Sequence, residues 1–469
     1  MDRPERPAPR GVPDTSRPPD GNFPLPGSGD PHPAGKGDTD RPAPAADVVV
    51  VGAGPAGLAA ARLLALADIP VTVLEARDRI GGRMATDHRD GFRLDRGWWP
   101  ALPGLDGPEL RSHLPDPPRV RALTGGVLLH ADGRSHRLGG SGHRSDGLPR
   151  HGGRSLTGAL DHAWLRANLG RLALLDEERL ASRPETSVDR ALEARGVPAR
   201  IAEGFLRPLL AALLCDPLLT TSCRLGDLRL RAFARGGLAL VAGGTDRLPA
   251  RLAADLPPGC VRTGVRVSAV RTREVETEGH GTLRCRAVVV ATDAEEAARL
   301  LPGLRRPDHH PVTVLHHTAD HLPDAGPTLI VDTARGGPIA HTTAVSAVDP
   351  ERAPDGRALI TSVVLGAEAG EPIETLDKAA RSQLARLHGV RAEEWELLAA
   401  CHDPRAAPAL PPPYAPRRRT RLLEGLYVCG GHRATPGAGG ELASARLAAE
   451  AVLADLGGRR TTADDRVAA

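Results

Sequence analysis

The chain has 469 residues, of which 41% are hydrophobic and 25% charged, as in an ordinary soluble globular protein of two or three domains. The formal net charge is only +3, aromatic residues make up 2%, and no arginine cluster alternates with aromatics, so nucleic-acid binding is excluded. No apolar run reaches about 18 residues and the charged first residues do not resemble a signal peptide, so we expect a cytoplasmic protein without a transmembrane helix. Its six cysteines form no C-x-x-C pair, and we expect them to be reduced.

Both ends of the chain are polar. Residues 1–45 are rich in Pro, Asp, Arg and Gly and show no apolar period, so we expect a disordered tail there. Residues 457–469 form a second polar tail. Lys36, one of only two lysines in the chain, falls in the first tail.

The first predicted element is the stretch "DVVVVGAGPAGLAAARLL" that begins at Asp47. Four valines predict a strand buried on both faces, and the alanine-rich segment after them predicts a helix. The glycines between them have the G-x-G-x-x-G spacing: one for a tight turn, one for close approach of a pyrophosphate, one for close helix packing. The predicted phosphate-binding residues are Gly52, Gly54, Pro55, Ala56 and Gly57.

A second strand follows in "IPVTVLEARDRIGGR" and ends at Glu75, 18 residues after Gly57. A carboxylate at this spacing accepts hydrogen bonds from ribose hydroxyls and would repel a 2′-phosphate. We therefore expect FAD or NAD rather than NADP, and we assign Ala76 and Arg77 to the same site. The remaining alternative for Glu75 is an exposed residue at the end of a strand.

The glycine pair Gly81–Gly82, followed by Arg83, makes this region similar to the N-terminus of the flavin-containing amine oxidase superfamily. That group includes amine oxidases, protoporphyrinogen oxidases and phytoene-desaturase-like proteins. The resemblance implies that the pair lies against the FAD pyrophosphate and that the arginine helps to hold it. Adjacent glycines permit close approach, and an arginine fork suits phosphate.

The resemblance continues in patches that together span residues 47–455, and it is closest to the desaturase-like branch. The patches are "DGFRLDRGWWP" from Asp90, "FLRPLLAALLCDPLLTTSCR" from Phe205, "GGTDRLPARLAADLPPGCVRTGVRVSAVR" from Gly243, "CRAVVVATDAEEAARLL" from Cys285 and "GLYVCGGHRATPGAGGELASARLAAEAVL" from Gly425. In relatives, a valine that we align with Val267 contacts the adenine through its backbone.

Two of these patches are expected to frame the edge of the flavin ring. The resemblance brings Gly97, Trp98 and Trp99 of the first patch together with Gly430, Gly431 and His432 of the last. The last patch departs from the family at Gly431, where relatives carry an aspartate that helps to hold the ribityl or phosphate region of FAD. We therefore expect noncovalent FAD, with weaker binding or with backbone N–H groups in place of that carboxylate.

The resemblance implies an α/β fold, in which a Rossmann-like FAD-binding domain of the glutathione-reductase type is interleaved with a substrate domain of mixed sheet and helices. The FAD-binding domain is expected in residues 46–98, 236–300 and 416–456, and the substrate domain in residues 99–235 and 301–415. Five histidines in "DHHPVTVLHHTADH" suggest a metal site, but adjacent histidines on a strand point to opposite faces, so we expect no metal.

Such a protein would be an FAD-dependent oxidoreductase that transfers hydride from an apolar small molecule to flavin N5, with oxygen or a quinone as acceptor. No catalytic residue is forced by the sequence. An amine oxidase is the first alternative, although Lys378 lies on a helix pattern and Tyr414 and Tyr427 are the only tyrosines. A flavin-binding protein without turnover is the second. The apolar segment from Phe205 predicts a core helix, with peripheral membrane contact as the alternative.

Overall fold

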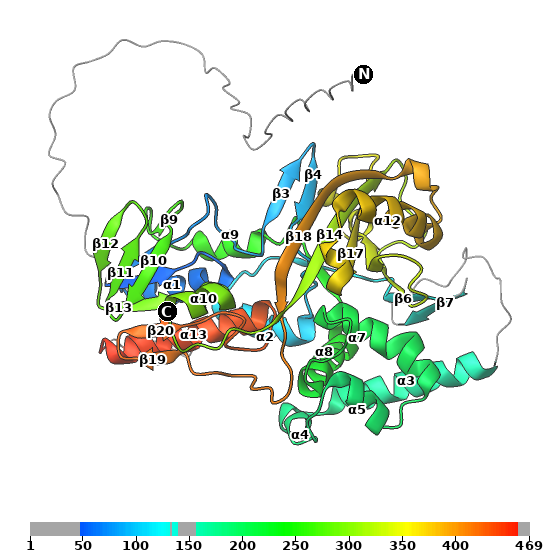
Figure 1. Cartoon of the computed structure of the whole chain (residues 1–469), viewed down its shortest axis with the longest axis horizontal. Coiled ribbons are helices and arrows are strands. Elements are labelled where there is room, and N and C mark those ends of the chain that lie inside the picture. Colours follow the sequence, from blue (N-terminus) through cyan, green and yellow to red (C-terminus); the bar gives the residue numbers. More distant parts are fainter. Residues whose placement is uncertain (1–46, 132–133, 139–155, 458–469) are drawn as a thin grey trace, which may run out of the picture. The chain divides into compact units, whose positions relative to one another are not determined.

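Figure 1 shows the computed structural model of the chain, which describes residues 47–131, 134–138 and 156–457. All of these residues belong to one compact unit, Ala45–Ala469. The expected disordered tail at 1–45 lies outside the described residues, as does the polar tail apart from Gly457.

The four valines of β1 (Val48–Val51) form the centre of a six-stranded sheet. All four are buried, and the strand pairs in parallel with a neighbour on each side, as expected for an unbroken run of β-branched residues. In spatial order the strands are β19 (Arg421–Leu423), β20 (Leu426–Val428), β13 (Ala287–Val290), β1, β2 (Val71–Leu74) and β9 (Val261–Arg262). Only the β19–β20 pair is antiparallel.

Two different layers cover this sheet. Val48 and Val50 pack with the helices α1 (Pro55–Ala65), α9 (Arg247–Ala253) and α13 (Ala438–Asp455). On the other face, Val49 and Val51 pack with α10 (Ala294–Leu300) and a three-stranded antiparallel sheet. That small sheet consists of β10 (Val267–Arg271), β11 (Glu274–Thr277) and β12 (Gly281–Arg284). The predicted α/β fold with a Rossmann-like domain of the glutathione-reductase type is therefore confirmed.

A second, seven-stranded sheet is antiparallel except for one parallel pair, β15–β6. In spatial order its strands are β18 (Glu396–Pro408), β14 (His309–Ala319), β17 (Ala358–Leu365), β16 (Ile339–Ala344), β15 (Leu329–Asp332), β6 (Val127–Ala131) and β7 (Arg134–Leu138). The strands β14 and β18 pair along most of their length and run side by side in Figure 1.

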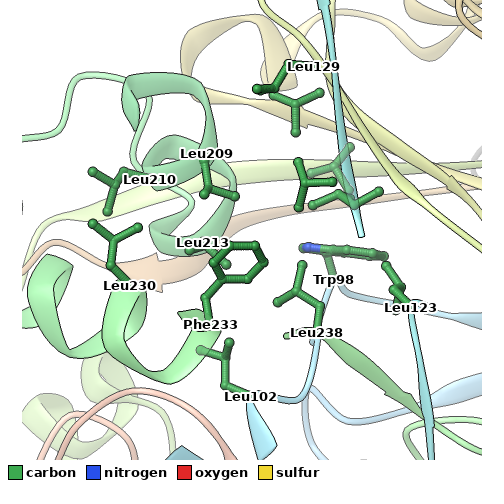
Figure 2. Packing of buried hydrophobic residues seen from close by; sticks show 14 of the residues in the cluster. Trp98, Leu102, Leu123, Leu129, Leu209, Leu210, Leu213, Leu230, Phe233 and Leu238 are labelled. Carbon is green, nitrogen blue, oxygen red and sulfur yellow. The ribbon is translucent and has the colours of Figure 1, made fainter. Parts of the chain in front are cut away.

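Helices cover both faces of this sheet. The amphipathic helix α12 (Ile373–His388) buries Leu376, Ala380 and Leu384 against one face. A helical layer covers the other face, and Figure 2 shows its leucines and Phe233 near Trp98. Its members are α3 (Leu156–Leu174), α4 (Glu177–Ala181), α5 (Val188–Ala194), α6 (Ala199–Ile201), the π-helix η1 (Ala202–Leu206), α7 (Arg207–Leu214) and α8 (Cys223–Gly236).

The remaining elements are short. They are the hairpin β3 (Thr86–Arg89) and β4 (Phe92–Asp95), helix α2 (Pro103–His113), the paired strands β5 (Val120–Ala122) and β8 (Ala239–Val241), helix α11 (Val345–Val348) and the 3-10 helices η2 (Pro350–Arg352), η3 (Gly366–Gly370) and η4 (Ala392–Glu394). All three expected FAD-binding segments contribute strands to the six-stranded sheet, but the domain boundaries remain a prediction.

The segment from Phe205 lies in the core, because Phe205, Leu209 and Leu210 are buried in the helical layer. Within the described ranges, no helix has the length and apolar character needed to cross a bilayer. The adjacent histidines of β14 do point to opposite faces: His316 contacts the carbonyl of Asp95, and His317 contacts Asp377 of α12. In the part of the chain that the structure describes, no three His, Cys, Asp or Glu side chains could share a metal ion.

Candidate functional site

The three glycines of the first turn have different surroundings. Gly52 has a φ of +103°, and a Cβ atom on Gly57 would lie 1.9 Å from the carbonyl oxygen of Gly52. Both glycines are therefore required by the protein backbone itself. Gly54, directly before Pro55 at the start of α1, is different, because a Cβ atom there would meet no heavy atom of the described residues within 4 Å. The open backbone of Gly54 at a helix N-terminus suits an anionic group.

Glu75 lies at the carboxyl end of β2 and is 8% exposed. Its Oε2 accepts a hydrogen bond from the N–H of Ala53 at 2.8 Å, and its Oε1 accepts one from the N–H of Arg77 at 3.0 Å. The carboxylate thus binds to the glycine turn, and each oxygen retains a lone pair for a further donor. Glu75 is therefore a buried residue rather than an exposed strand end, whereas Ala76 and Arg77 are exposed.

The second glycine pair lies against the first turn. The N–H of Gly81 donates to the carbonyl of Ala53 at 2.8 Å, and a Cβ atom on Gly82 would lie 3.4 Å from the Cα of Gly54. Both Gly81 and Gly82 have positive φ, of +107° and +58°. The structure thus brings the two predicted glycine motifs together, around the open backbone of Gly54.

The segment that precedes β10 lies beside Glu75. The N–H of Gly264 donates to the carbonyl of Arg77 at 2.8 Å, and the N–H of Val265 donates to the carbonyl of Glu75, also at 2.8 Å. Val267 is the first, buried residue of β10, and its carbonyl accepts a hydrogen bond from Arg299 at 2.9 Å. Contact between Val267 and adenine remains a prediction.

A cavity of about 640 Å³ begins at the second glycine pair and extends between the two sheets. Its volume falls within the range of about 300–1,000 Å³ that is usual for small-molecule sites. One end is lined by polar groups around Arg83, which are Arg77, Gly82, Arg83, Gly431, Gly437 and Glu441. Toward α7, β14 and β18 the lining is mainly apolar, with Trp98, Ala212, Leu213, Leu214, Val312, Val314, Ala399 and Ala400, but it also includes Cys401, His402 and Asp403 of β18.

Arg83 contacts several groups at the polar end of the cavity. Its Nη1 donates to the carbonyl of Ala406 at 2.9 Å, its Nη2 lies 3.4 Å from Oε1 of Glu441, and its guanidinium lies 5.1 Å from the ring centre of Trp99. Burial raises the pKa of Glu441, although the charge of Arg83 opposes this shift. A cation at this place, beside a glycine pair with exposed backbone, suits a phosphate.

The N-terminus of α13 also reaches the cavity. The N–H of Gly439, in the first turn of the helix, donates to Oδ1 of the buried Asp106 at 2.9 Å. Asp106 itself lines the cavity, and so does Arg229, whose Nη2 donates to the carbonyl of Pro436 at 2.6 Å. The positive end of the helix is thus partly neutralised by Asp106, and Arg229 lies next to it.

Gly97, Trp98 and Trp99 line the same cavity as Gly82 and Gly431. Trp98 packs in the apolar core (Figure 2). Its ring lies 5.1 Å from that of His341. Trp99 has a buried Nε1 without a hydrogen-bond partner among the described residues. A Cβ atom on residue 97 would lie 2.4 Å from that Nε1, so glycine is needed there to make room for the indole.

Gly430 and His432 do not line this cavity, although Gly431 between them does. Gly430 is held by Ser444, whose Oγ accepts its N–H at 2.9 Å. His432 lines a separate pocket of about 60 Å³ beside Arg433. Burial and, to a smaller extent, the charge of Arg433 lower the pKa of His432 to about 4, so the ring is neutral at pH 7. The assignment of His432 to a flavin edge remains a prediction.

Sequence reasoning missed most of the cavity wall. Leu213 and Leu214 end α7, Val314 lies in β14, and Ala400 lies in β18, and nothing in the sequence indicates that these segments meet. Glu441 was also missed. Its only signal was an acidic residue in the first turn of a helix that is otherwise rich in alanine and glycine.

The arrangement fits FAD. The open backbone at Gly54 and the arginines near Gly82 suit a diphosphate, and the carboxylate of Glu75 suits a ribose. The apolar end of the cavity, closed by Trp98, suits a flat apolar ring. Of the predicted residues, the structure gathers both glycine motifs, Glu75, Arg83, Gly431 and the Gly97–Trp99 segment around one continuous region.

Comparison with known proteins gives short, strong sequence matches and long structural ones. The chain is 63% identical over 51 residues to putrescine oxidase of Kocuria rosea, a match that covers 11% of either chain. It is 54% identical over 50 residues to polyamine oxidase 4 of Oryza sativa subsp. japonica, covering 11% of this chain and 10% of that one. The matches therefore span only about a tenth of the length of these curated relatives.

The structural matches extend over nearly the whole fold. Putrescine oxidase bound to putrescine aligns with a TM-score of 0.64 at 19% identity and covers 87% of this chain and 99% of that chain. An oxidoreductase from Methanosarcina mazei aligns with a TM-score of 0.65 at 17% identity, with the same coverage. At these identities the likeness is one of fold. Residues 55–453 match the sequence model described as flavin containing amine oxidoreductase, and the chain therefore belongs to the family of flavin-containing amine oxidoreductases.

Proposed function

We propose that this protein is an FAD-dependent oxidoreductase that removes hydride from an apolar small molecule bound beside the flavin. The supporting observation is the cavity, which is continuous from Arg83 and Gly82 to an apolar chamber formed by α7, β14 and β18. FAD is the cofactor of the family to which the chain belongs, and when bound it supplies a hydride acceptor.

The residues of this chain would bind and orient the two ligands. Gly54, Gly82 and Arg83 would hold the diphosphate, and Glu75 the adenosine ribose. The chamber would orient the substrate by packing Trp98, Leu213 and Val314 around it.

The two cysteines that line the cavity are not poised for covalent chemistry, and the Nδ1 atom of His402, which also lines it, is paired with Oγ1 of Thr313 at 2.8 Å. Burial raises the pKa of Cys215 to about 11 and also raises that of Cys401, so both lining cysteines remain neutral thiols at pH 7. This agrees with a reaction that depends on orientation beside the cofactor. We propose oxygen or a quinone as electron acceptor, because the sequence has one dinucleotide fingerprint and no second one for a nicotinamide cofactor.

An amine oxidase is the second candidate, and the names of the relatives favour it, since they include putrescine oxidase and polyamine oxidase. The cavity favours it less. Lys378 is exposed on α12, and neither Tyr414 nor Tyr427 is among the lining residues. Of the lining carboxylates, Asp87 is paired with Arg79 and Arg96, and Asp106 binds backbone N–H groups. Two further lining carboxylates, Asp403 and Glu441, have partners as well, namely the N–H of Arg405 and the guanidinium of Arg83. Each carboxylate that lines the cavity in the described residues thus already has a donor.

Anaerobic titration of the purified protein tests the proposal. We expect a yellow protein whose flavin is released on heat denaturation and bleached by an apolar polyene or by a tetrapyrrole precursor. If only primary or secondary amines bleach the flavin, the proposal is wrong and the protein is an amine oxidase. If none of these compounds bleaches the flavin, a flavin-binding protein without turnover is favoured. If the protein gains no flavin absorbance with added FAD, all three functions are refuted.

A further inference from the structure

Glu441 is a buried carboxyl group with very few partners. Its side chain is 12% exposed, and its one hydrogen bond to the described residues is the long contact of 3.4 Å with Nη2 of Arg83. Folding has nevertheless placed it in the wall of the cavity, in the first turn of α13. A buried carboxyl group normally has strong hydrogen bonds, so a carboxyl with a single weak one needs an explanation.

Glu441 lies at the polar end of the cavity, in contact with Arg83. Arg83 and Gly82 mark the polar end, and Gly431 lies directly beside the carboxyl group. The part of FAD that connects a diphosphate to a flavin ring is the ribityl chain, which carries hydroxyl groups. A hydroxyl group donates a hydrogen bond to a carboxylate, whereas a diphosphate would repel it.

The surroundings of Gly431 support the same assignment. A Cβ atom on Gly431 would lie 3.3 Å from Oε1 of Glu441 and 3.9 Å from Nη2 of Arg83. A carboxylate carried by residue 431 would therefore occupy nearly the same region as that of Glu441, and would have the same arginine as neighbour. The two positions compete for one place, and this chain has glycine at one of them and glutamate at the other.

We infer that Glu441 is an FAD-binding residue whose carboxyl group receives a ribityl hydroxyl, and that it replaces from helix α13 the carboxylate that the sequence lacks at position 431. The inference rests on the FAD binding in the proposed function. It also explains why Gly431 is small, because the side chain of Glu441 fills the space that a larger residue would need.

Reconstitution of the apoprotein with FAD, followed by flavin fluorescence quenching, tests this inference. We expect Glu441→Gln and Glu441→Ala to raise the dissociation constant of FAD about ten- to hundredfold, the effect of losing one charge-assisted hydrogen bond. Glu450→Gln, which removes an exposed carboxylate from the same helix, is the matched control and should bind FAD as the wild type does.

The exchange of the two positions is the sharper test. Gly431→Asp alone brings a second carboxylate into contact with Glu441, so this variant should bind FAD more weakly than the wild type does. Gly431→Asp combined with Glu441→Ala should restore most of the lost affinity. The melting temperature of each apoprotein separates folding from binding, since an FAD-binding role leaves the apoprotein melting temperature of Glu441→Gln near the wild-type value.

The outcomes separate this inference from the proposed function. A wild-type protein that binds no FAD would overturn both. If the wild-type protein binds FAD and both Glu441→Gln and Glu441→Ala bind it as tightly as the wild type does, the inference alone is overturned. Weak binding by Glu441→Ala without any recovery in the double variant would show that residue 441 is not exchangeable with residue 431, which also overturns it.

Discussion

At the scale of single residues, the glycines of one fingerprint have separable roles. Gly57 is required by the fold, because any side chain there would collide with the carbonyl of Gly52. Gly54 has ordinary φ and open space above it, so the fold alone would accept alanine. The reason for glycine at position 54 must therefore lie in what binds there.

The comparison of Gly54→Ala with Gly57→Ala measures this difference. We expect Gly54→Ala to keep the wild-type melting temperature but to bind FAD about ten- to hundredfold more weakly, because a methyl group would meet the diphosphate. Gly57→Ala should lower the free energy of unfolding by ~1–3 kcal/mol, because the backbone at Gly52 must move to make room for the new Cβ atom. Thermal unfolding and FAD titration measure the two effects. Equal melting temperatures and equal FAD affinities in the two variants would contradict this interpretation.

Glu75 supports both the turn and the ribose. We expect Glu75→Ala to weaken FAD binding about ten- to hundredfold, because a charge-assisted hydrogen bond contributes ~1.5–3 kcal/mol. Glu75→Gln keeps one acceptor oxygen and should show a smaller loss. The exposed Asp78 is the control residue, and Asp78→Ala should leave the affinity unchanged. Equal affinities in all three variants, measured by isothermal titration, would mean that Glu75 only stabilises the turn.

These residues were predictable because their signals are local. The glycine spacings, the strand valines and the acid after β2 all lie within Val48–Arg83, and each has a chemical reason that can be stated without coordinates. Glu441 was not predictable, since its role depends on Arg83 and Gly431, which are 358 and 10 residues away from it. One acidic residue in a helical first turn is common and indicates nothing by itself.

At the scale of elements, a buried ion pair joins the hairpin β3–β4 to the seven-stranded sheet region. Asp95 ends β4 and accepts hydrogen bonds from Oγ1 of Thr86 at 2.6 Å and from the N–H of Thr245 at 2.9 Å. Nη1 of Arg352, in η2, donates to Asp95 at 2.6 Å, and Nε of the same arginine lies 3.4 Å from Asp349. Three distant segments are thus tied together next to the cavity.

Arg352→Met should therefore destabilise the protein by about 3–5 kcal/mol, because it leaves Asp95 buried without its counter-charge. The matched control is Arg357→Met, which removes a partly exposed arginine from a pair with Glu396 and should cost no more than ~1 kcal/mol. Urea unfolding at pH 7 measures both. Equal losses in the two variants would mean that the buried pair contributes no more than a surface pair does.

The effect of Arg352→Met should also depend on pH. Burial alone would raise the pKa of Asp95, but the charge of Arg352 and the hydrogen bonds from Thr245 and Thr86 outweigh it, so the pKa lies below its usual value of 3.8. A lowered folded-state pKa gives stability that is present above pH 3.8 and is lost as the pH falls through the folded-state value. The difference in free energy of unfolding between the wild type and Arg352→Met should therefore shrink as the pH falls from 7 toward 3. A difference that stays constant over this range would contradict the role assigned to the Asp95–Arg352 pair.

Elements were predictable in type but not in assembly. A run such as "ALITSVVL" indicates a strand, and α12 has a clear amphipathic period, because both signals lie within one element. The pairing of β14 with β18, and the parallel pair β15–β6 across 200 residues of sequence, carry no such local signal. The apolar end of the cavity depends on these pairings, which is why its lining residues could not be named in advance.

At the scale of the whole described unit, one cavity takes its walls from segments that are far apart in the chain. Gly82 and Trp98 come from its first part, Leu214 from its middle, and Ala400 and Gly431 from its last part. The polar and apolar ends are thus separate surfaces of one space, and a substitution at one end should change one property only.

Leu214→Glu tests this separation. The side chain is half-buried and lines the apolar end, where an unpaired carboxylate is costly beside an apolar ligand. We expect unchanged FAD affinity, and bleaching by an apolar substrate that is slower by about ten- to hundredfold. Leu214→Met conserves the volume and should stay near the wild-type rate. Faster bleaching by amines in Leu214→Glu than in wild type would show that the same chamber admits a cation once a carboxylate is present, whereas unchanged rates with every substrate would remove Leu214 from the site.

The order of strands in the six-stranded sheet has a consequence for biosynthesis. The neighbour of β1 in the sheet, β13, is made more than 230 residues after β1, and α13, which packs on α1 and carries Glu441, is made later still. Until these segments are made, the glycine turn lacks both Ala291, against which Gly52 and Gly57 pack, and the helix that lines the cavity with Glu441. The growing chain has no complete place for the cofactor before α13 is made, and the supply of FAD in the cell from then on should govern how much of the newly made protein reaches the native state.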